Sequence, residues 1–127
     1  MKGIEGWHLV IKNRDPGGLK ELLADNAVFH SPVVHTPQEG AAKVMMYLAA
    51  AFKVLANPSF RYVRELNQGQ NSVLEFVCEI DGVHVNGVDM IRFNDEGKIE
   101  DFKVMLRPLQ GIDKVKEQMA KLLQARS

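Results

Sequence analysis

The sequence has a single cysteine, Cys78, among its 127 residues, so the chain cannot form an internal disulfide. It also lacks an excess of charge of either sign, because Lys plus Arg and Asp plus Glu each number 16. This balance and the absence of a basic run argue against a surface for nucleic acid. No apolar run approaches the ~20 residues that cross a bilayer, and the N-terminus has no signal-peptide pattern. We therefore expect a cytoplasmic protein that binds neither nucleic acid nor membranes.

The patterns that are present predict one α+β domain over residues 1–127. Helical periodicity comes first and strand alternation follows, an order typical of α+β rather than alternating α/β proteins. Asp15-Pro16 starts the second helix, and Thr36-Pro37-Gln38-Glu39 starts the third as a capping box with proline at the first helical position. The predicted helices cover 3–12, 16–24, 37–55 and about 112–123, and the predicted strands cover 27–31, 59–67, 72–80, 83–93 and 98–107.

Asp89 is the most informative residue for function. It shares one face of strand 83–93 with apolar residues, namely Val83, Val85, Ile91 and Phe93. A carboxylate without partners there would carry a large desolvation penalty. Either backbone N–H groups or a tryptophan satisfy it within the core, or it faces a cavity and has a raised pKa. We favour the cavity, because apolar pockets usually contain a few polar groups that orient a ligand, and the core alternative stays open.

Two segments around these residues resemble the NTF2-like superfamily, and most closely its SnoaL-like branch, which includes polyketide cyclases. Residues 87–99 resemble the penultimate hairpin of that fold, and residues 23–33, followed by Gly40, resemble its entry strand and third helix. The resemblance implies a cone in which three N-terminal helices pack on a strongly curved antiparallel sheet, with a C-terminal helix. It also implies a homodimer, a pocket for a small apolar molecule, and no cofactor.

Ketosteroid isomerases belong to the same superfamily and have an aspartate base before a Pro-Val pair, a tyrosine donor on the first helix and a protonated aspartate on the penultimate hairpin. In this sequence Asp89 matches the protonated aspartate, Trp7 falls at the donor position, and Ser31 falls at the base position. The resemblance therefore implies an acid and an indole donor without the usual base, because an unassisted serine cannot abstract a proton from carbon near neutral pH. His30 would replace the base only if a bulge at Pro32 turned it inward, since strand alternation separates His30 from Ser31.

The rest of the predicted pocket is apolar. Its walls are expected from inward-facing residues of the strands, namely Phe29, Phe76, Phe102, Val104 and Leu106. On strand 59–67 the same alternation places Phe60, Tyr62 and Leu66 inward. Tyr47 lies at the edge of the buried stripe of the third helix, where its hydroxyl either binds a ligand or reaches a backbone carbonyl. His30, His35 and Asp89 contain no short-spaced ligand pair, so we expect no metal site.

These observations lead to three functional hypotheses. The first is an isomerase, cyclase or lyase without a cofactor, in which Asp89 is the acid or oxyanion donor for a small hydrophobic carbonyl compound, assisted by Trp7, with His30 or a water as base. The second is a non-catalytic module that binds an apolar ligand or a peptide. The third is a dimeric scaffold that associates through apolar residues on the outer face of the sheet, namely Val63, Val73, Val77, Val88 and Met90.

Overall fold

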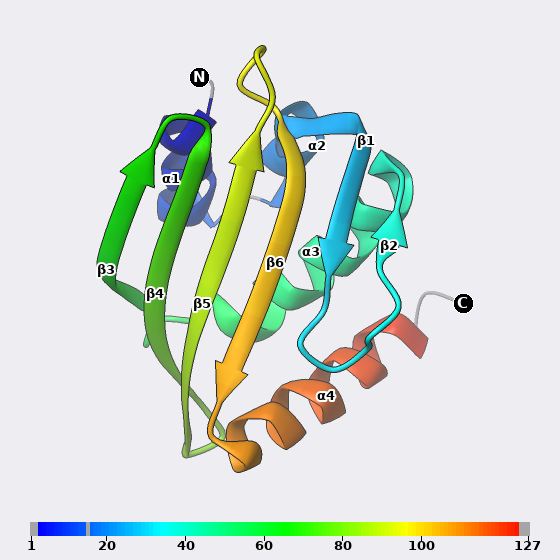
Figure 1. Cartoon of the computed structure of the whole chain (residues 1–127). Helices are drawn as coiled ribbons and strands as arrows, with labels where there is room; N and C mark the ends of the chain where they lie inside the picture. The colour runs from blue at the N-terminus through cyan, green and yellow to red at the C-terminus, as the bar shows by residue number, and fades with distance from the viewer. Residues whose placement is uncertain (1–2, 15, 125–127) are drawn as a thin grey trace.

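The computed structural model describes residues 3–14 and 16–124, which form a six-stranded sheet covered by helices (Figure 1). The helical elements are α1 (Gly3–Asn13), the 3-10 turn η1 (Pro16–Gly18), α2 (Leu19–Leu22), α3 (Ala41–Leu55) and α4 (Leu109–Gln124). The strands are β1 (Leu23–His30), β2 (Gln38–Glu39), β3 (Arg61–Gln68), β4 (Asn71–Ile80), β5 (Val83–Phe93) and β6 (Ile99–Arg107). They are ordered β2-β1-β6-β5-β4-β3, with β1 parallel to β6 and the other neighbours antiparallel.

The sheet bends around α3, which packs along its inner face, while α1 lies behind β3 and α4 crosses the end of β5 and β6 (Figure 1). Between sheet and helices lies a cluster of buried apolar residues that includes the fully buried rings of Phe29, Phe76 and Phe102. Burying one such side chain stabilises a fold by about 1.5–3 kcal/mol, so this layer holds the helices on the sheet. In the described part of the chain, no helix combines the length and the apolar character needed to cross a bilayer.

The predicted α+β architecture is confirmed, and the three strands 72–80, 83–93 and 98–107 agree with β4, β5 and β6 to within one residue at each end. The second predicted helix is shorter than expected, because β1 already begins at Leu23. Leu23 pairs with Ile99 of β6, so ladder hydrogen bonds replace helical ones there. The expected N-cap of that helix, Asp15, lies outside the described residues.

The capping box predicted at Thr36 is wrong. Residues Gln38–Glu39 form the short strand β2, which pairs with β1, and α3 begins only at Ala41. Gly40 is the residue before the helix, with φ of 95°, a conformation that glycine adopts without strain. Its N–H donates to the carbonyl oxygen of Ala27 at 2.9 Å. Pairing with β1 therefore occupies the backbone that the local motif would have used to start a helix.

A bulge in β3 corrects the predicted inward face of that strand. The register with β4 shifts around Val63, so that two residues of β3 take the place of one. Tyr62 stays on the inner face as predicted, but Leu66 lies on the outer face and is 64% exposed. Glu65 takes the inner side instead and ion-pairs with His8 of α1 at 2.7 Å. The bulge thus brings a polar side chain under α1.

The terminal helix starts earlier than predicted, at Leu109, and includes Gly111 in its first turn. A Cβ atom at Gly111 would lie 3.3 Å from the carbonyl oxygen of His84 and 3.3 Å from Val85. The glycine therefore serves the close approach of α4 to β5 and does not end the helix.

Candidate functional site

Asp89 lies at the end of a directional chain of hydrogen bonds on the inner face of the sheet. The Tyr62 hydroxyl donates to Oδ2 of Asp89 at 2.6 Å, and Nε1 of Trp7 donates to the Tyr62 hydroxyl at 2.9 Å. An indole N–H can only donate, so the Tyr62 oxygen accepts from Trp7 and its own proton points at Asp89. The chain therefore runs from α1 through β3 to β5.

The environment of Asp89 favours its neutral form. Burial raises the pKa of Asp89 from 3.8 to about 7, although the hydrogen bond from Tyr62 acts in the opposite direction. Burial, and after it the neighbouring Asp89 charge, raises the pKa of Tyr62 well above its ordinary 10.0. Tyr62 therefore remains a donor to Oδ2, and the proton of neutral Asp89 has to sit on Oδ1.

Asp89 borders a cavity of ≈ 30 Å³ between the inner face of the sheet, α1 and α3. The wall is apolar and contains five aromatic rings, those of Trp7, Phe52, Phe60, Phe76 and Phe102. Of the described residues that line the cavity, Asp89 is the one ionisable side chain. A buried water needs roughly 10–15 Å³ of such space, so the cavity holds about one or two waters, and a larger ligand would have to displace side chains of the wall.

The two carboxyl oxygens of Asp89 differ in their contacts. In the part of the chain that the structure describes, every fully buried side-chain nitrogen or oxygen has a hydrogen-bond partner. The hydrogen bond of Asp89 with Tyr62 uses Oδ2, so Oδ1 is the atom that meets the cavity. Asp89 itself is 5% exposed. A ligand atom there would meet an O–H donor when Asp89 is neutral and a carboxylate oxygen when it is ionised.

Helix α1 covers this site and is fixed to β3 at two points. Trp7 contacts the ring of Phe102 at a centroid distance of 5.0 Å besides bonding to Tyr62. One residue further, His8 binds Glu65, and its ring lies perpendicular to that of Tyr62, with centroids 6.0 Å apart. The Trp7 contacts are buried and the His8 contact is half-exposed, so α1 separates the cavity from solvent along this side.

The other predicted pocket residues divide into two groups. Phe76, Phe102 and Val104 line the cavity together with Trp7 and Asp89. Phe29 and Tyr47 do not line it, and their rings stack on each other with centroids 6.3 Å apart. Tyr47 therefore packs beside the cavity from α3.

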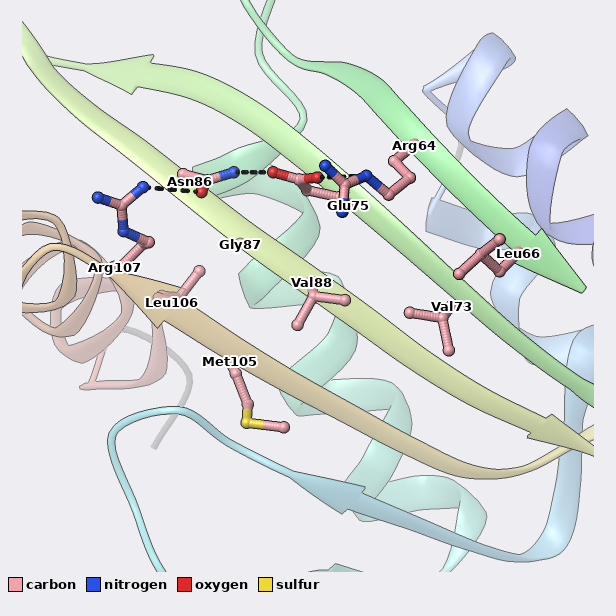
Figure 2. Close-up of a pocket in the computed structure, with 10 residues that line it drawn as sticks. All are labelled: Arg64, Leu66, Val73, Glu75, Asn86, Gly87, Val88, Met105, Leu106 and Arg107. Atoms are coloured by element: carbon pink, nitrogen blue, oxygen red, sulfur yellow. Dashed lines mark hydrogen bonds and ion pairs between the residues drawn. The ribbon is translucent and has the colours of Figure 1, made fainter.

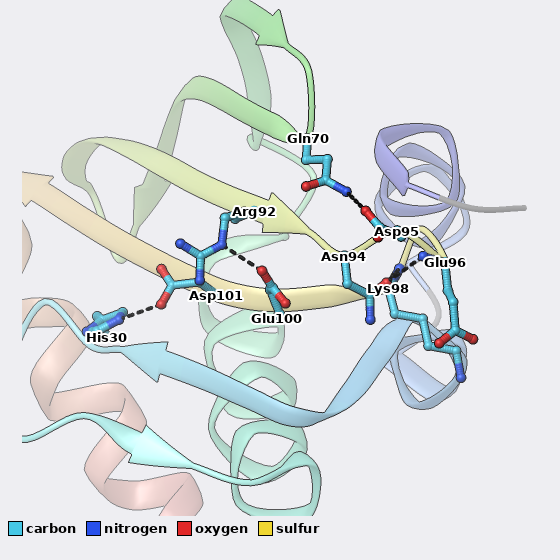
Figure 3. Close-up of polar contacts among 9 residues, drawn as sticks. All are labelled: His30, Gln70, Arg92, Asn94, Asp95, Glu96, Lys98, Glu100 and Asp101. Atoms are coloured by element: carbon cyan, nitrogen blue, oxygen red, sulfur yellow. Dashed lines mark hydrogen bonds and ion pairs between the residues drawn. The ribbon is translucent and has the colours of Figure 1, made fainter.

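His30 and Ser31 lie away from Asp89. His30 faces outward from β1 and its Nε2 lies 2.9 Å from Oδ1 of Asp101 on β6 (Figure 3). The alternative in which a bulge turns His30 into the pocket is wrong, because the alternation of β1 continues from Ala27 to His30. Ser31 follows the strand, and its Oγ accepts from the N–H of Val33 at 3.1 Å. Among the described residues, no cluster of three His, Cys, Asp or Glu side chains is placed to hold a metal ion.

Tyr62 is the site residue that sequence reasoning missed. Its inward orientation was expected, but its partner depends on three neighbouring strands. Tyr62 lies opposite Phe76, which lies opposite Gly87, two residues before Asp89. A Cβ atom at Gly87 would collide with the Phe76 ring and lie 2.6 Å from Leu106. The available signal was therefore the glycine, which makes room for an aromatic ring beside an inward tyrosine.

A separate groove of ≈ 440 Å³ lies on the outer face of the sheet, and Figure 2 shows its lining. Its floor consists of apolar side chains from four strands, namely Leu66, Val73, Val88 and Met105. A polar border runs along one end, where Glu75 ion-pairs with Arg64 at 3.3 Å and accepts from Asn86 at 3.1 Å. Asn86 in turn accepts from Arg107 at 3.3 Å. Leu66 and Met105 are 64% and 49% exposed, so the floor is open to solvent.

Proteins of known structure resemble this chain in both sequence and fold. Residues 4–102 match the family of SnoaL-like domains. The crystal structure of a steroid delta-isomerase from Pseudomonas aeruginosa is 40% identical in sequence, with 97% of this chain and 90% of that chain covered and a TM-score of 0.91. A bacterial protein with a cystatin-like fold from Silicibacter pomeroyi DSS-3 is 28% identical, with 97% and 91% covered and a TM-score of 0.84.

A more distant structure, named as a SnoaL-like polyketide cyclase from Jannaschia sp. CCS1, is 13% identical over 88% of this chain and 90% of that chain, with a TM-score of 0.69. At that identity the likeness concerns the fold alone. None of the curated proteins matches this chain. The matches confirm the resemblance that was predicted from residues 23–33 and 87–99.

Proposed function

The chain belongs to the SnoaL-like family, and on that premise we propose that it binds a small apolar molecule through a carbonyl oxygen at Oδ1 of Asp89. One observation carries the proposal: Asp89 lines an apolar cavity while its Oδ2 is occupied by the Tyr62 hydroxyl, which leaves Oδ1 to meet a ligand. Neutral Asp89 donates from Oδ1 to an acceptor on the ligand. The aromatic wall then takes the apolar remainder of the molecule, as in most small-molecule sites.

The same arrangement supports an isomerase-type activity. A carbonyl oxygen gains negative charge when a proton leaves the neighbouring carbon, and a donor fixed in an apolar site stabilises that charge strongly. Asp89 is then the oxyanion donor, with Tyr62 and Trp7 holding its orientation. The relative that is named a steroid delta-isomerase, at 40% identity, supports this reaction class. His30 is on the other face of the sheet, so the described wall of the cavity supplies the oxyanion donor and no second ionisable side chain to act as base.

A non-catalytic binding protein is the second candidate. It is favoured by the wall of the cavity, in which no described residue besides Asp89 is ionisable. The two candidates share the ligand contact at Oδ1 and differ in turnover. A β,γ-unsaturated ketone such as cyclohex-3-enone distinguishes them, because its isomerisation produces a conjugated enone that absorbs in the ultraviolet.

Binding of cyclohex-3-enone, followed by NMR titration well below and well above pH 7, tests the contact at Oδ1. The wild type should bind more weakly at the higher pH, because ionised Asp89 has lost its donor. Asp89→Asn keeps an N–H donor and an acceptor for Tyr62, so it should bind at both pH values, whereas Asp89→Leu should not bind. Asp101→Asn, on the outer face, is the matched control. Equal binding by wild type and Asp89→Leu would contradict the proposal.

For the partner, we propose a homodimer that buries the outer-face groove. The exposed floor formed by Leu66 and Met105 supports this, because open apolar patches on a soluble protein usually mark an interface. Sedimentation analysis at micromolar concentration should give a dimer for the wild type and a monomer for Leu66→Asp. Leu109→Asp, which replaces a side chain 72% exposed on α4, is the control. A wild-type monomer would rule the dimer out.

A further inference from the structure

The edge of β6 that faces β1 is left open where β1 ends. The pairing between these strands stops at His30 and Lys103, so the last four residues of β6, Val104 to Arg107, have no strand beside them on this side. The chain turns away there because Pro32 has no N–H to offer and the N–H of Val33 is already bound to Ser31. It returns only at β2, after a loop (Figure 1). No backbone hydrogen bond joins the described residues of that loop to 104–107.

A groove of ≈ 460 Å³ lies along this edge. One wall comes from the loop, and the other from β6 between Lys103 and Leu106. Lys103 and Met105 face outward and Val104 and Leu106 face inward, yet all four line the groove. The loop that forms the opposite wall follows β1, so the groove lies on the side of β6 from which β1 has turned away. The groove therefore follows the strand edge itself, where backbone N–H and C=O groups are presented.

The titratable side chains that line the groove are all basic. The described lining contains Lys103, His30 and His35 and no carboxylate. The nearest acid, Asp101, binds His30 from the outer face at 2.9 Å and is not part of the lining. Between the basic groups, the apolar side chains of Val34 and Met105 are 41% and 49% exposed.

We propose that this open edge of β6 binds a short extended peptide with acidic side chains, which adds a strand next to Val104–Arg107. A row of unpaired backbone groups is a template for another strand, and peptides that extend a sheet in this way gain affinity from main-chain hydrogen bonds and specificity from alternate side chains. Four residues of strand span roughly 13 Å. The acidic side chains meet Lys103 and the histidines, and an apolar side chain lies between Val34 and Met105. The site shares Val104 with the wall of the Asp89 cavity, and Met105 and Leu106 with the outer-face groove, but it is distinguished from both by the loop that follows β1.

Fluorescence anisotropy with labelled Glu-Val-Glu-Val-Glu tests the class of ligand on the full chain. We expect saturable binding of this peptide and weaker binding of Lys-Val-Lys-Val-Lys. A version with N-methylated backbone amides should bind at least about tenfold more weakly, because losing one or two hydrogen bonds corresponds to about that factor. Amide exchange at residues 104–107 should slow when the first peptide is added. Equal binding of the N-methylated peptide, or no binding of the acidic peptide, would overturn the proposal.

Two variants separate this site from others of similar charge. Lys103→Glu should weaken binding of the acidic peptide, and Lys53→Glu, a charge reversal at an exposed position of α3, should not. Butyrate that displaces the peptide completely would identify a small-carboxylate site and refute strand addition. In the absence of peptide, amide protection at residues 104–107 could instead increase with protein concentration. That result would show that a second copy of the chain occupies the edge, and it would also refute the peptide-binding proposal. None of these outcomes depends on Asp89.

Discussion

The carboxyl groups on the two faces of the sheet lie in opposite environments. On the inner face, Asp89 has no cationic partner among the described residues, and burial raises its pKa to about 7. On the outer face, Asp101 lies 2.9 Å from His30 and Glu100 lies 2.8 Å from Arg92 (Figure 3). These outer side chains are between 26% and 53% exposed, so water screens their charges.

Strand register produces this difference over a very short distance. Asp89 lies opposite Val104 and Asp101 lies opposite Arg92, on the same two strands β5 and β6. Successive side chains alternate between faces, so a carboxyl group is buried with a raised pKa on one side of the sheet and lies beside a basic side chain on the other. The face of the sheet on which an aspartate lies therefore determines whether its carboxyl group is buried or paired with a basic side chain.

The largest expected effect is a pH dependence of stability that originates at Asp89. Its pKa in the folded protein, about 7, exceeds the ordinary 3.8, so between these values the folded state keeps a proton that the unfolded state has lost. Stability from this group is full below about pH 4 and falls as the pH rises to about 7, by roughly 4 kcal/mol in total. Urea unfolding of the wild type between these pH values should show the fall, and Asp89→Asn should remove it.

The control for this comparison is Asp101→Asn on the outer face. It should leave the fall of stability with pH in place, because Asp101 is not the group that is buried without a cationic partner. A wild type whose stability is constant over this range would mean that Asp89 is not buried in the folded protein.

Removing the donor to Asp89 should have the next largest effect. In Tyr62→Phe, Asp89 loses the hydrogen bond that lowers its pKa, and Nε1 of Trp7 loses its acceptor. An unsatisfied buried group lowers the free energy of unfolding by about 1–3 kcal/mol. Urea unfolding at low pH measures this loss, and the midpoint of the pH dependence should move upward. Restoring stability by the second change Trp7→Phe would show that the orphaned indole carries most of the loss, and an unchanged midpoint would contradict the direct bond to Asp89.

The sequence predicted much of the fold because alternation and turn residues act locally. Strands β4, β5 and β6 were placed to within one residue at each end by this means. The failures occurred where distant segments decide the outcome. Thr36 begins a good capping box, yet pairing of residues 38–39 with β1 prevails. The bulge at Val63 has no sequence signature, and it moved Leu66 to the outer face.

In the candidate site, too, the sequence predicted the local feature and missed the one that depends on distant segments. The inward position of Asp89 could be predicted from its apolar neighbours along one strand. Its partner could not, because Tyr62 reaches Asp89 only when Phe76 fills the space that Gly87 leaves on the strand between them. A relation among three strands is not visible in the pattern of any one of them.

Gly87 therefore provides a third test of the inner face. In Gly87→Ala the added methyl would meet the Phe76 ring and lie 2.6 Å from Leu106. Overpacking of this kind lowers stability by about 1–3 kcal/mol, and displacement of the ring should also disturb the bond from Tyr62 to Asp89. Urea unfolding gives the first effect, and the pH midpoint of stability gives the second. Val88→Ala, next in the chain but on the outer face, is the control and should leave the midpoint unchanged.

The smallest effect is expected on the outer face itself. Arg92 and Glu100 are 53% and 26% exposed at their side chains, and exposed ion pairs contribute about 0–1 kcal/mol. Arg92→Ala and Glu100→Ala should each change the free energy of unfolding by less than about 0.5 kcal/mol in high salt, where the remaining attraction is screened. A double-mutant cycle measures the coupling between them. A coupling energy as large as the stability lost in Tyr62→Phe would contradict the difference between the two faces. It would mean that the outer carboxylates are also shielded from water. A second copy of the chain that covered this surface would have that effect.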